Sequence, residues 1–97
     1  MIIGTVAIHI HLHGIGSLKD KRRIVKSLVE RLKSRFNFSV AEVAAQNSKI
    51  RAVIGIATVA NDATFVNRAI DKVIEFVRRD GRFYMGNVNR EIFSSEE

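Results

Sequence analysis

Strict alternation of side chains over Met1–His13 constrains the fold of this chain more than any other feature of its sequence. From Thr5 onward the even positions are aliphatic, and the odd positions hold Thr5, Ala7, His9, His11 and His13. A period of two places successive side chains on opposite faces of an extended strand. Met1–His13 is therefore expected to be a strand with one buried and one open face.

After this strand, the apolar residues recur with the period of a helix. Gly14 and Gly16 interrupt the alternation, and Ser17 followed by Asp20 resembles a capping box at a helix start. On a wheel of about 100° per residue, one stripe collects Leu18, Ile24, Val25, Leu28, Val29, Leu32 and Phe36. The segment from Ser17 to Arg35 is thus predicted to be an amphipathic helix.

The remaining sequence repeats these two patterns. A short strand with imperfect alternation, which suits a sheet edge, precedes a strand with clear alternation. A second helix follows, capped by Asn61 and Asp62 and ended by Gly81, and the last strand has the weakest pattern. The predicted ranges are Phe38–Val43, Ile50–Ala60, Ala63–Arg79 and Val88–Phe93.

The order strand-helix-strand-strand-helix-strand predicts an α+β fold. This order consists of two strand-helix-strand halves. Together they form a ferredoxin-like βαββαβ sandwich, with both helices on one face of a four-stranded antiparallel sheet. The expected strand order is 4-1-3-2, which puts the two most apolar strands in the centre. With 97 residues the chain suffices for one modest core, so residues 1–97 are expected to form a single domain.

The net charge of the chain is concentrated in its predicted first helix. Ser17–Arg35 contains eight Lys and Arg residues and two acids, and the rest of the chain contains eight of each, so this segment carries the whole charge of +6. An arc of about 100° beside the apolar stripe collects Lys19, Arg22, Arg23, Lys26 and Lys33. Charge this localised indicates an anionic partner, although a solvated face without a partner is the alternative.

Structured RNA or a ribosomal surface is the partner we expect for these five cations, and an acidic protein is the alternative. Neutralised phosphates release counterions, so salt should weaken binding with a log–log slope of roughly −2 to −4. The open faces of the two central strands carry no Phe, Tyr or Trp on which bases could stack. Binding should therefore depend on backbone and shape rather than on sequence.

A second anion site is conceivable at the start of the first helix. Free amides near Gly16 and Ser17, together with the helix dipole, favour an anion, and Lys21 could extend toward the same place from the apolar stripe. The spacing of a phosphate-binding P-loop is missing. A glycine-rich turn before a capped helix explains the same residues.

The histidines of the chain, His9, His11 and His13, all fall on the open face of the first strand. Alternate residues of a strand lie about 6.6–6.8 Å apart, so two imidazoles could share a zinc ion if a neighbouring strand supplied a further ligand. A pH-sensitive surface is another reading. An ordinary polar sheet face remains the simplest interpretation.

The open face of the Ile50–Ala60 strand is unusually apolar for a surface in water. Its side chains are Val53, Gly55, Ala57 and Val59. Such a face is expected to be covered, and a second copy of the same sheet would give a two-fold homodimer.

Catalysis is not expected from this inventory. The chain has no cysteine, its serines lack a convincing base and acid, and Glu42 fits an edge position open to solvent. We therefore expect a non-enzymatic protein that needs no cofactor. No apolar run approaches the length of a membrane span, and a soluble, cytoplasmic protein is expected.

Several stretches of the chain resemble the YlxP-like family of small bacterial proteins. They are Met1–Gly4, Gly16–Leu28, Phe38–Val43 and Ala57–Asp62. The resemblance implies a ferredoxin-like fold and, because members are described as candidate ribosome-binding factors, a place near translation. It supplies no catalytic residues. Arg90 stands where family members tend to have an apolar residue, so the register of the last strand is left open.

Overall fold

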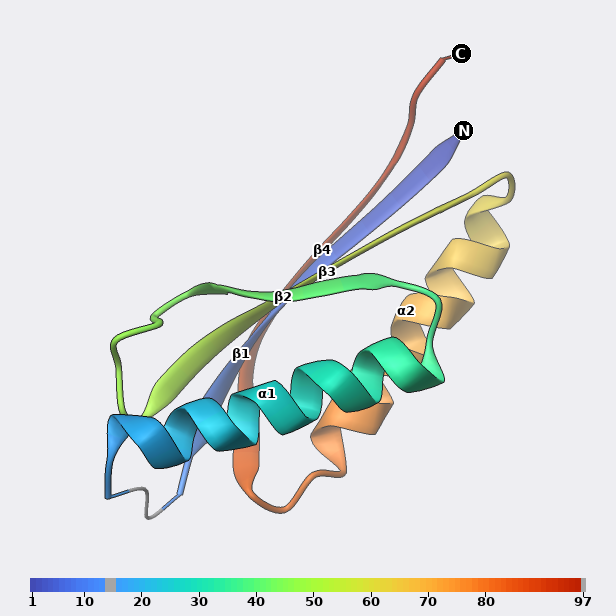
Figure 1. Ribbon diagram of the computed structural model, residues 1–97. Helices are drawn as coiled ribbons and strands as arrows, with labels where there is room; N and C mark the ends of the chain where they lie inside the picture. Colours follow the sequence, from blue (N-terminus) through green and yellow to red (C-terminus); the bar gives the residue numbers. More distant parts are fainter. Residues whose placement is uncertain (14–15, 97) are drawn as a thin grey trace.

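The computed structural model describes residues 1–13 and 16–96, and it has an α+β architecture with six elements (Figure 1). Their order is the predicted strand-helix-strand-strand-helix-strand. The elements are β1 (Ile2–Leu12), α1 (Leu18–Arg35), β2 (Ser39–Ala44), β3 (Arg51–Ala60), α2 (Ala63–Arg78) and β4 (Phe83–Ser94).

All strand pairs of the four-stranded sheet are antiparallel. β1 pairs with β3 on one side and with β4 on the other, and β2 pairs with β3. The order across the sheet is β2-β3-β1-β4, which is 4-1-3-2 when read from the β4 edge. The two strands with the clearest alternation are therefore central, and β2 is at an edge as its shorter pattern predicted.

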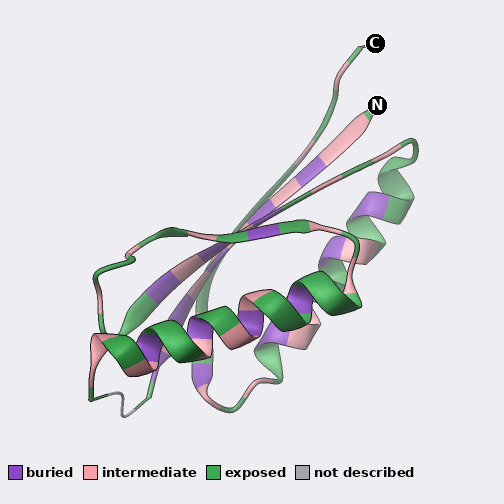
Figure 2. Ribbon diagram, viewed as in Figure 1, coloured by how far each residue is buried: buried purple, intermediate pink, exposed green. Residues whose placement is uncertain are grey.

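The core lies between one face of the sheet and the two helices, which are on the same side of it (Figures 1 and 2). The even residues of β1 from Val6 to Leu12 point into this layer, as the alternation predicted. They pack with buried residues of β3 and of both helices in one apolar cluster. Neither of the helices in the described chain covers the opposite face of the sheet, which is called the open face below.

α2 approaches β1 most closely at Gly4. A Cβ on this residue would overlap with the side chain of Val66 and lie 3.0 Å from Ile70 Cδ1. Both of these α2 residues are fully buried. The absence of a side chain at Gly4 thus lets the helix pack directly on the backbone of the central strand.

β4 begins at Phe83, five residues before the predicted start at Val88. The register between β1 and β4 shifts between Ile8 and Ile10, so β4 contains a bulge near Gly86 and Asn87. Phe83 faces the core before the bulge and Val88 faces it afterwards. The inward positions change from odd to even, and this inversion hides the period of two in the sequence.

The bulge also settles the register of Arg90. This residue pairs with Val6 of β1 and so lies on the helix side of the sheet. Its guanidinium donates to Asp71 Oδ1 at 2.7 Å and to Asn67 Oδ1 at 3.1 Å, both on α2. Arg90 therefore occupies an inward position at the sheet edge by reaching polar groups on the rim of α2.

Candidate nucleic-acid interface

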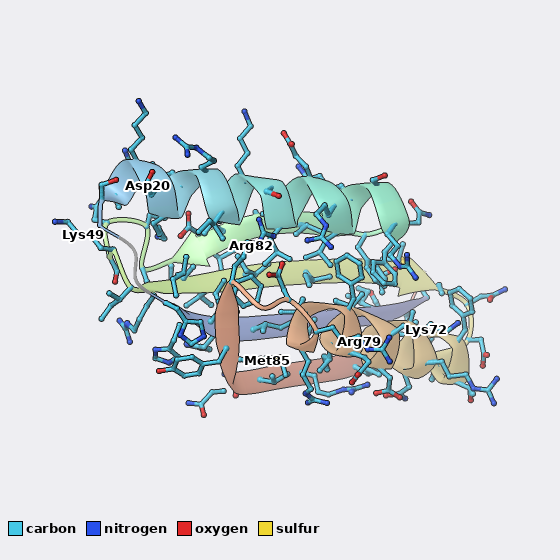
Figure 3. All side chains as sticks on the ribbon, turned by 90° about the horizontal axis from the view of Figure 1, so that it is seen from below. Asp20, Lys49, Lys72, Arg79, Arg82 and Met85 are labelled. Carbon is cyan, nitrogen blue, oxygen red and sulfur yellow. The ribbon has the colours of Figure 1, made fainter. Side chains whose placement is uncertain are left out.

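α1 presents its cations outward because its opposite face is bound to the sheet. Ser17 caps the helix, and its Oγ accepts a hydrogen bond from the Asp20 amide at 3.1 Å, as the capping-box pattern predicted. Val25, Leu28 and Leu32 are buried against the sheet. Figure 3 shows long nitrogen-tipped side chains projecting from the far side of this helix.

The predicted basic surface is exposed and largely free of partners. Its residues, named the basic face below, are Lys19, Arg22, Arg23, Lys26 and Lys33, and each is exposed. Arg23 lies 3.7 Å from Asp20. Among the described residues, the other four form no ion pair with a carboxylate. Their charges are available to an external anion.

Five arginines outside this face form ion pairs within the protein. Arg82 and Arg31 pair with Asp80, Arg78 and Arg79 pair with Glu75, and Arg90 pairs with Asp71, at distances of 2.6–3.2 Å. The cations outside the face that form no ion pair in the described chain are spread over several elements and loops: Arg35, Lys49, Arg51, Arg68 and Lys72. The basic face therefore differs from the rest of the surface in its density of unpaired charge.

The position of Lys21 shows that one prediction from the sequence, its place in an anion site at the start of α1, was wrong. Its side chain is fully buried and does not reach an anion at the helix start. Its ammonium group donates to Glu42 Oε2 at 2.6 Å, to the Ala45 carbonyl at 2.9 Å and to the Gln46 carbonyl at 3.3 Å. All three donors are used, so the anion site predicted from Gly16, Ser17 and Lys21 loses its cationic side chain.

Glu42 is likewise not the solvent-facing edge residue that the sequence suggested. Its side chain is only 16% exposed. Glu42 shares the phase of buried Val40 and pairs with Ile54, so it faces the helices. A charged residue of each sign on an otherwise apolar face, Lys21 on α1 and Glu42 on β2, is the sequence signal that could have revealed this pair.

Asp80, which follows α2, holds the C-terminal half of α1 in place. Its carboxylate accepts from Arg82 Nη2 at 2.6 Å and from Arg31 Nη1 at 3.2 Å, and Arg82 Nη1 also donates to Ser27 Oγ at 3.3 Å. Hydrogen bonds from the Arg82 side chain hold the pKa of Asp80 below its ordinary value, and they raise the pKa of Arg82. The network connects α1 to the segment between α2 and β4.

The three histidines lie on β1 or directly after it, and two of them contact an aromatic residue that the sequence prediction did not place on the sheet. Tyr84 pairs with His11 in the β1–β4 register. Its ring stacks on His11 with centroids 4.9 Å apart and lies 5.2 Å from the ring of His13. Tyr84 was missed because β4 was predicted to begin only at Val88.

No group of three metal-ligating side chains occurs among the residues that the structure describes. This holds for histidine, cysteine, aspartate and glutamate side chains, His9, His11 and His13 included. The described part of the chain thus gives no support to a metal site at the histidines.

A family model described as "Protein of unknown function (DUF503)" matches residues 3–90 of the chain. This chain belongs to that family. It is also similar to "Uncharacterized protein YlxP" of Bacillus subtilis (strain 168), with 29% identity over 76 residues, which are 78% of this chain and 83% of the relative. The resemblance to YlxP-like proteins noted from the sequence is confirmed, and neither description states an activity.

The open face of this DUF503 chain carries a shallow hollow of about 460 Å³ in its middle. The small side chains of Ala7, Ala41, Gly55 and Ala57 line it together with Val43. Val43, Val59 and Phe93 are exposed on the molecular surface at 57%, 62% and 46%. The apolar character predicted for this face is thus present in the structure.

No helix within the described residues combines the length and the apolar character needed to cross a membrane.

Proposed function

We propose that this chain is a ferredoxin-like, non-enzymatic binding protein that docks on structured RNA, such as a ribosomal RNA surface, through the basic face of α1. The observation that carries the proposal is that Lys19, Arg22, Lys26 and Lys33 are exposed on one side of one helix without an ion-pair partner in the described chain. Contact with ribosomes would place the protein in the cytoplasm.

The length of the basic face suits a run of phosphates. Lys19 and Lys33 are fourteen residues apart, which is about 21 Å along a helix that rises 1.5 Å per residue. A cation recurs on nearly every turn of this length, and each can neutralise one phosphate and release its counterion. Arg23 should contribute less than the other four because Asp20 lies beside it.

An acidic protein could also be attracted to this face, but the face lacks the features of a protein interface. Protein interfaces depend on buried aromatic or aliphatic anchors surrounded by polar residues. The exposed side of α1 presents lysine, arginine and one exposed acid within the basic arc, Glu30, and it has no exposed large apolar residue. A polyanion with regularly spaced charges needs no such anchor, so RNA is the better match.

The test measures binding of a fluorescein-labelled RNA hairpin by anisotropy over a series of salt concentrations. Wild-type protein should bind with a log–log salt slope of roughly −2 to −4. The variant Arg22→Glu/Lys26→Glu/Lys33→Glu should lose binding while its circular dichroism stays that of a folded protein. Three charge reversals bring the net charge from +6 to zero.

The matched control is Arg68→Glu/Lys72→Glu/Arg78→Glu on α2, which gives the same net charge on a different helix. This control should retain most of its affinity for the RNA. Its lower net charge weakens the long-range attraction to the RNA, but the contacts between the α1 cations and the phosphates remain. Equal loss of affinity in both variants would reduce the effect to net charge and overturn the proposal. Failure to bind the hairpin, together with a pull-down by the wild-type chain that nuclease does not affect and that the α1 variant loses, would identify the acidic-protein alternative instead.

We also propose that the open face forms a homodimer with a second copy of the chain. The apolar hollow and the exposed side chains of Val43, Val59 and Phe93 support this occupant. The charge distribution supports it too. α1 lies on the opposite side of the sheet (Figure 1), so two copies meeting sheet to sheet keep their basic helices apart.

A further inference from the structure

We infer that His11, His13 and Tyr84 form a stacking surface for an unpaired nucleobase of the RNA bound by this protein. The inference rests on the proposed function, which it extends from phosphate contacts to a base contact. The three residues are called the ring cluster below. They lie at one end of the open face, and Tyr84 comes from the edge strand β4 rather than from the two central strands, whose open faces carry no Phe, Tyr or Trp.

The geometry of the ring cluster is that of an open aromatic surface. Tyr84 and His11 are nearly parallel, with an angle of 9° between ring planes, and His13 is inclined by 37° to Tyr84. Tyr84 is 54% exposed, and His13 is also exposed. A rigid aromatic surface in water is what a flat, apolar ligand with polar edges requires, and a nucleobase fits this description.

The backbone fixes the positions of these rings. β1 and β4 pair directly at His11 and Tyr84, and the His11 ring packs over Gly86, where an added Cβ would lie 3.2 Å from His11 Nε2. The His13 amide donates to the Arg82 carbonyl at 3.4 Å. His11 and Tyr84 are therefore held by the sheet, and His13 directly follows β1, so little conformational entropy is lost when a base stacks on the two paired rings.

A cation lies beside the rings. Arg51 pairs with His11 in the β1–β3 register, and its side chain is exposed. No ion pair engages Arg51 within the described chain. The open-face acid Glu91 pairs with Thr5, which is six residues or about 20 Å along β1 from His11. The end of the open face thus combines stacking groups with a free guanidinium, which suits a base and its phosphate.

One RNA molecule reaches both the ring cluster and the basic face only by passing round the end of the sheet, because the rings are on the open face and α1 lies on the opposite side. The cap of α1 is near this same end. Ser17 is four residues after His13, a separation of at most about 15 Å between Cα atoms. The RNA favoured by this arrangement has a helical or structured part that contacts α1 and an unpaired nucleotide next to it.

The proposed dimer leaves this end of the open face accessible. Val59 and Phe93 pair with Ile3 of β1, which is eight residues from His11, or about 27 Å. The hollow includes Ala7 and Gly55, which pair with each other and lie four residues, or about 13 Å, from His11. A second copy whose contacts end at the hollow therefore leaves the ring cluster open to a base.

The experiment uses the full-length chain and a short single-stranded RNA that carries one 2-aminopurine. Stacking on the rings should quench the 2-aminopurine fluorescence. Replacing an aromatic that stacks on a base weakens binding by roughly 5-fold to 150-fold, and we expect a loss in this range, with loss of quenching, for Tyr84→Ala. Tyr84→Phe keeps the ring and should keep the quenching.

The matched control is Phe65→Ala, which removes another exposed aromatic residue, 61% exposed on α2. Its quenching should equal that of the wild type. If Tyr84→Ala quenches as strongly as the wild type, or if Phe65→Ala and Tyr84→Ala lose quenching equally, the inference is overturned. Absence of any quenching in the folded wild-type protein at low salt overturns it as well.

A fully paired RNA duplex distinguishes this result from failure of the proposed function. Tyr84→Ala should bind the duplex like the wild type, because the duplex offers no free base. The triple α1 variant should lose the duplex. Quenching of the single strand without any duplex binding would reject the basic face and retain the ring cluster.

Discussion

The ammonium group of Lys21 and the carboxylate of Glu42 form an ion pair of 2.6 Å in which the lysine side chain has no exposed surface. The pair joins the first turns of α1 to the edge strand β2. Two carbonyls of the segment after β2, those of Ala45 and Gln46, complete the hydrogen bonds of the lysine. Ala45 adopts a φ of 60°, in the left-handed region that residues other than glycine rarely occupy. The backbone takes this conformation where it presents the two carbonyl acceptors to Lys21.

Lys21→Met should destabilise the protein by about 3 kcal/mol, because it leaves the largely buried Glu42 carboxylate without its cation. The double variant Lys21→Met/Glu42→Leu should regain most of this loss, since an apolar pair needs no compensation. Urea unfolding of the wild type, both single variants and the double variant measures the coupling. Additive effects of the two changes would show that the pair does not act as a unit.

Asp80→Asn should cost about 2 kcal/mol near neutral pH, because the carboxylate accepts charged hydrogen bonds from Arg82 and Arg31. The pKa of Asp80 is lowered in the folded state, so its stabilisation is present above the unfolded-state pKa of about 3.9 and is lost as the pH falls through the folded-state pKa. The stability difference between wild type and variant should therefore shrink below about pH 4.

Chemical unfolding at a series of pH values measures this difference. A gap between the two proteins that stays constant down to strongly acidic pH would contradict the role given to Asp80.

Gly4→Ala should destabilise the protein by about 1–3 kcal/mol, because the new methyl group would overlap with Val66 and force α2 away from β1. Gly81→Ala is the matched control, since no atom lies within 4 Å of the Cβ position there. Thermal unfolding of the two variants should separate them by several degrees. If Gly4→Ala left the unfolding temperature unchanged, α2 could shift without loss of packing, and the prediction would be wrong.

Val59→Lys should convert the proposed homodimer to a monomer, because it places a charge on the apolar end of the open face, where Val59 is 62% exposed. Sedimentation equilibrium at tens of micromolar measures the mass of both proteins. Lys49→Glu changes an exposed charge away from that end and should leave the mass unchanged. A monomeric mass for the wild-type protein at this concentration would contradict the proposed homodimer.

Much of the fold could be predicted because local pattern and tertiary environment agree in four of the elements. β1 and β3 have one buried and one open face throughout, and each helix keeps a single apolar side. β4 could not be delimited in this way. Its bulge inverts the phase of the inward residues, and Arg90 occupies an inward position through partners on α2 that are distant in sequence.

Within the candidate site, too, the features set by local periodicity could be predicted, and those set by contacts between distant residues could not. The exposure of Lys26 and Lys33 follows from helix periodicity alone, so the wheel predicted it. The burial of the Lys21 side chain depends on its ion pair with Glu42, 21 residues away. A local sequence pattern around Lys21 does not predict this pair. Tyr84 joined His11 and His13 only once the early start of β4 was known, because strand pairing brings these rings together.

The bulge at Gly86 and Asn87 makes β4 one residue longer than a straight ladder needs, because these two residues lie opposite His9 alone. Deleting either of them would leave a regular ladder in which Met85 still pairs with Ile10 and Val88 with Ile8. Tyr84 would then stay beside the histidines. Deleting a residue beyond the bulge, such as Asn89, would instead turn either Val88 or Ile92 away from the core. Relatives can therefore lose one residue at the bulge, whereas a single missing codon elsewhere in this strand should be damaging.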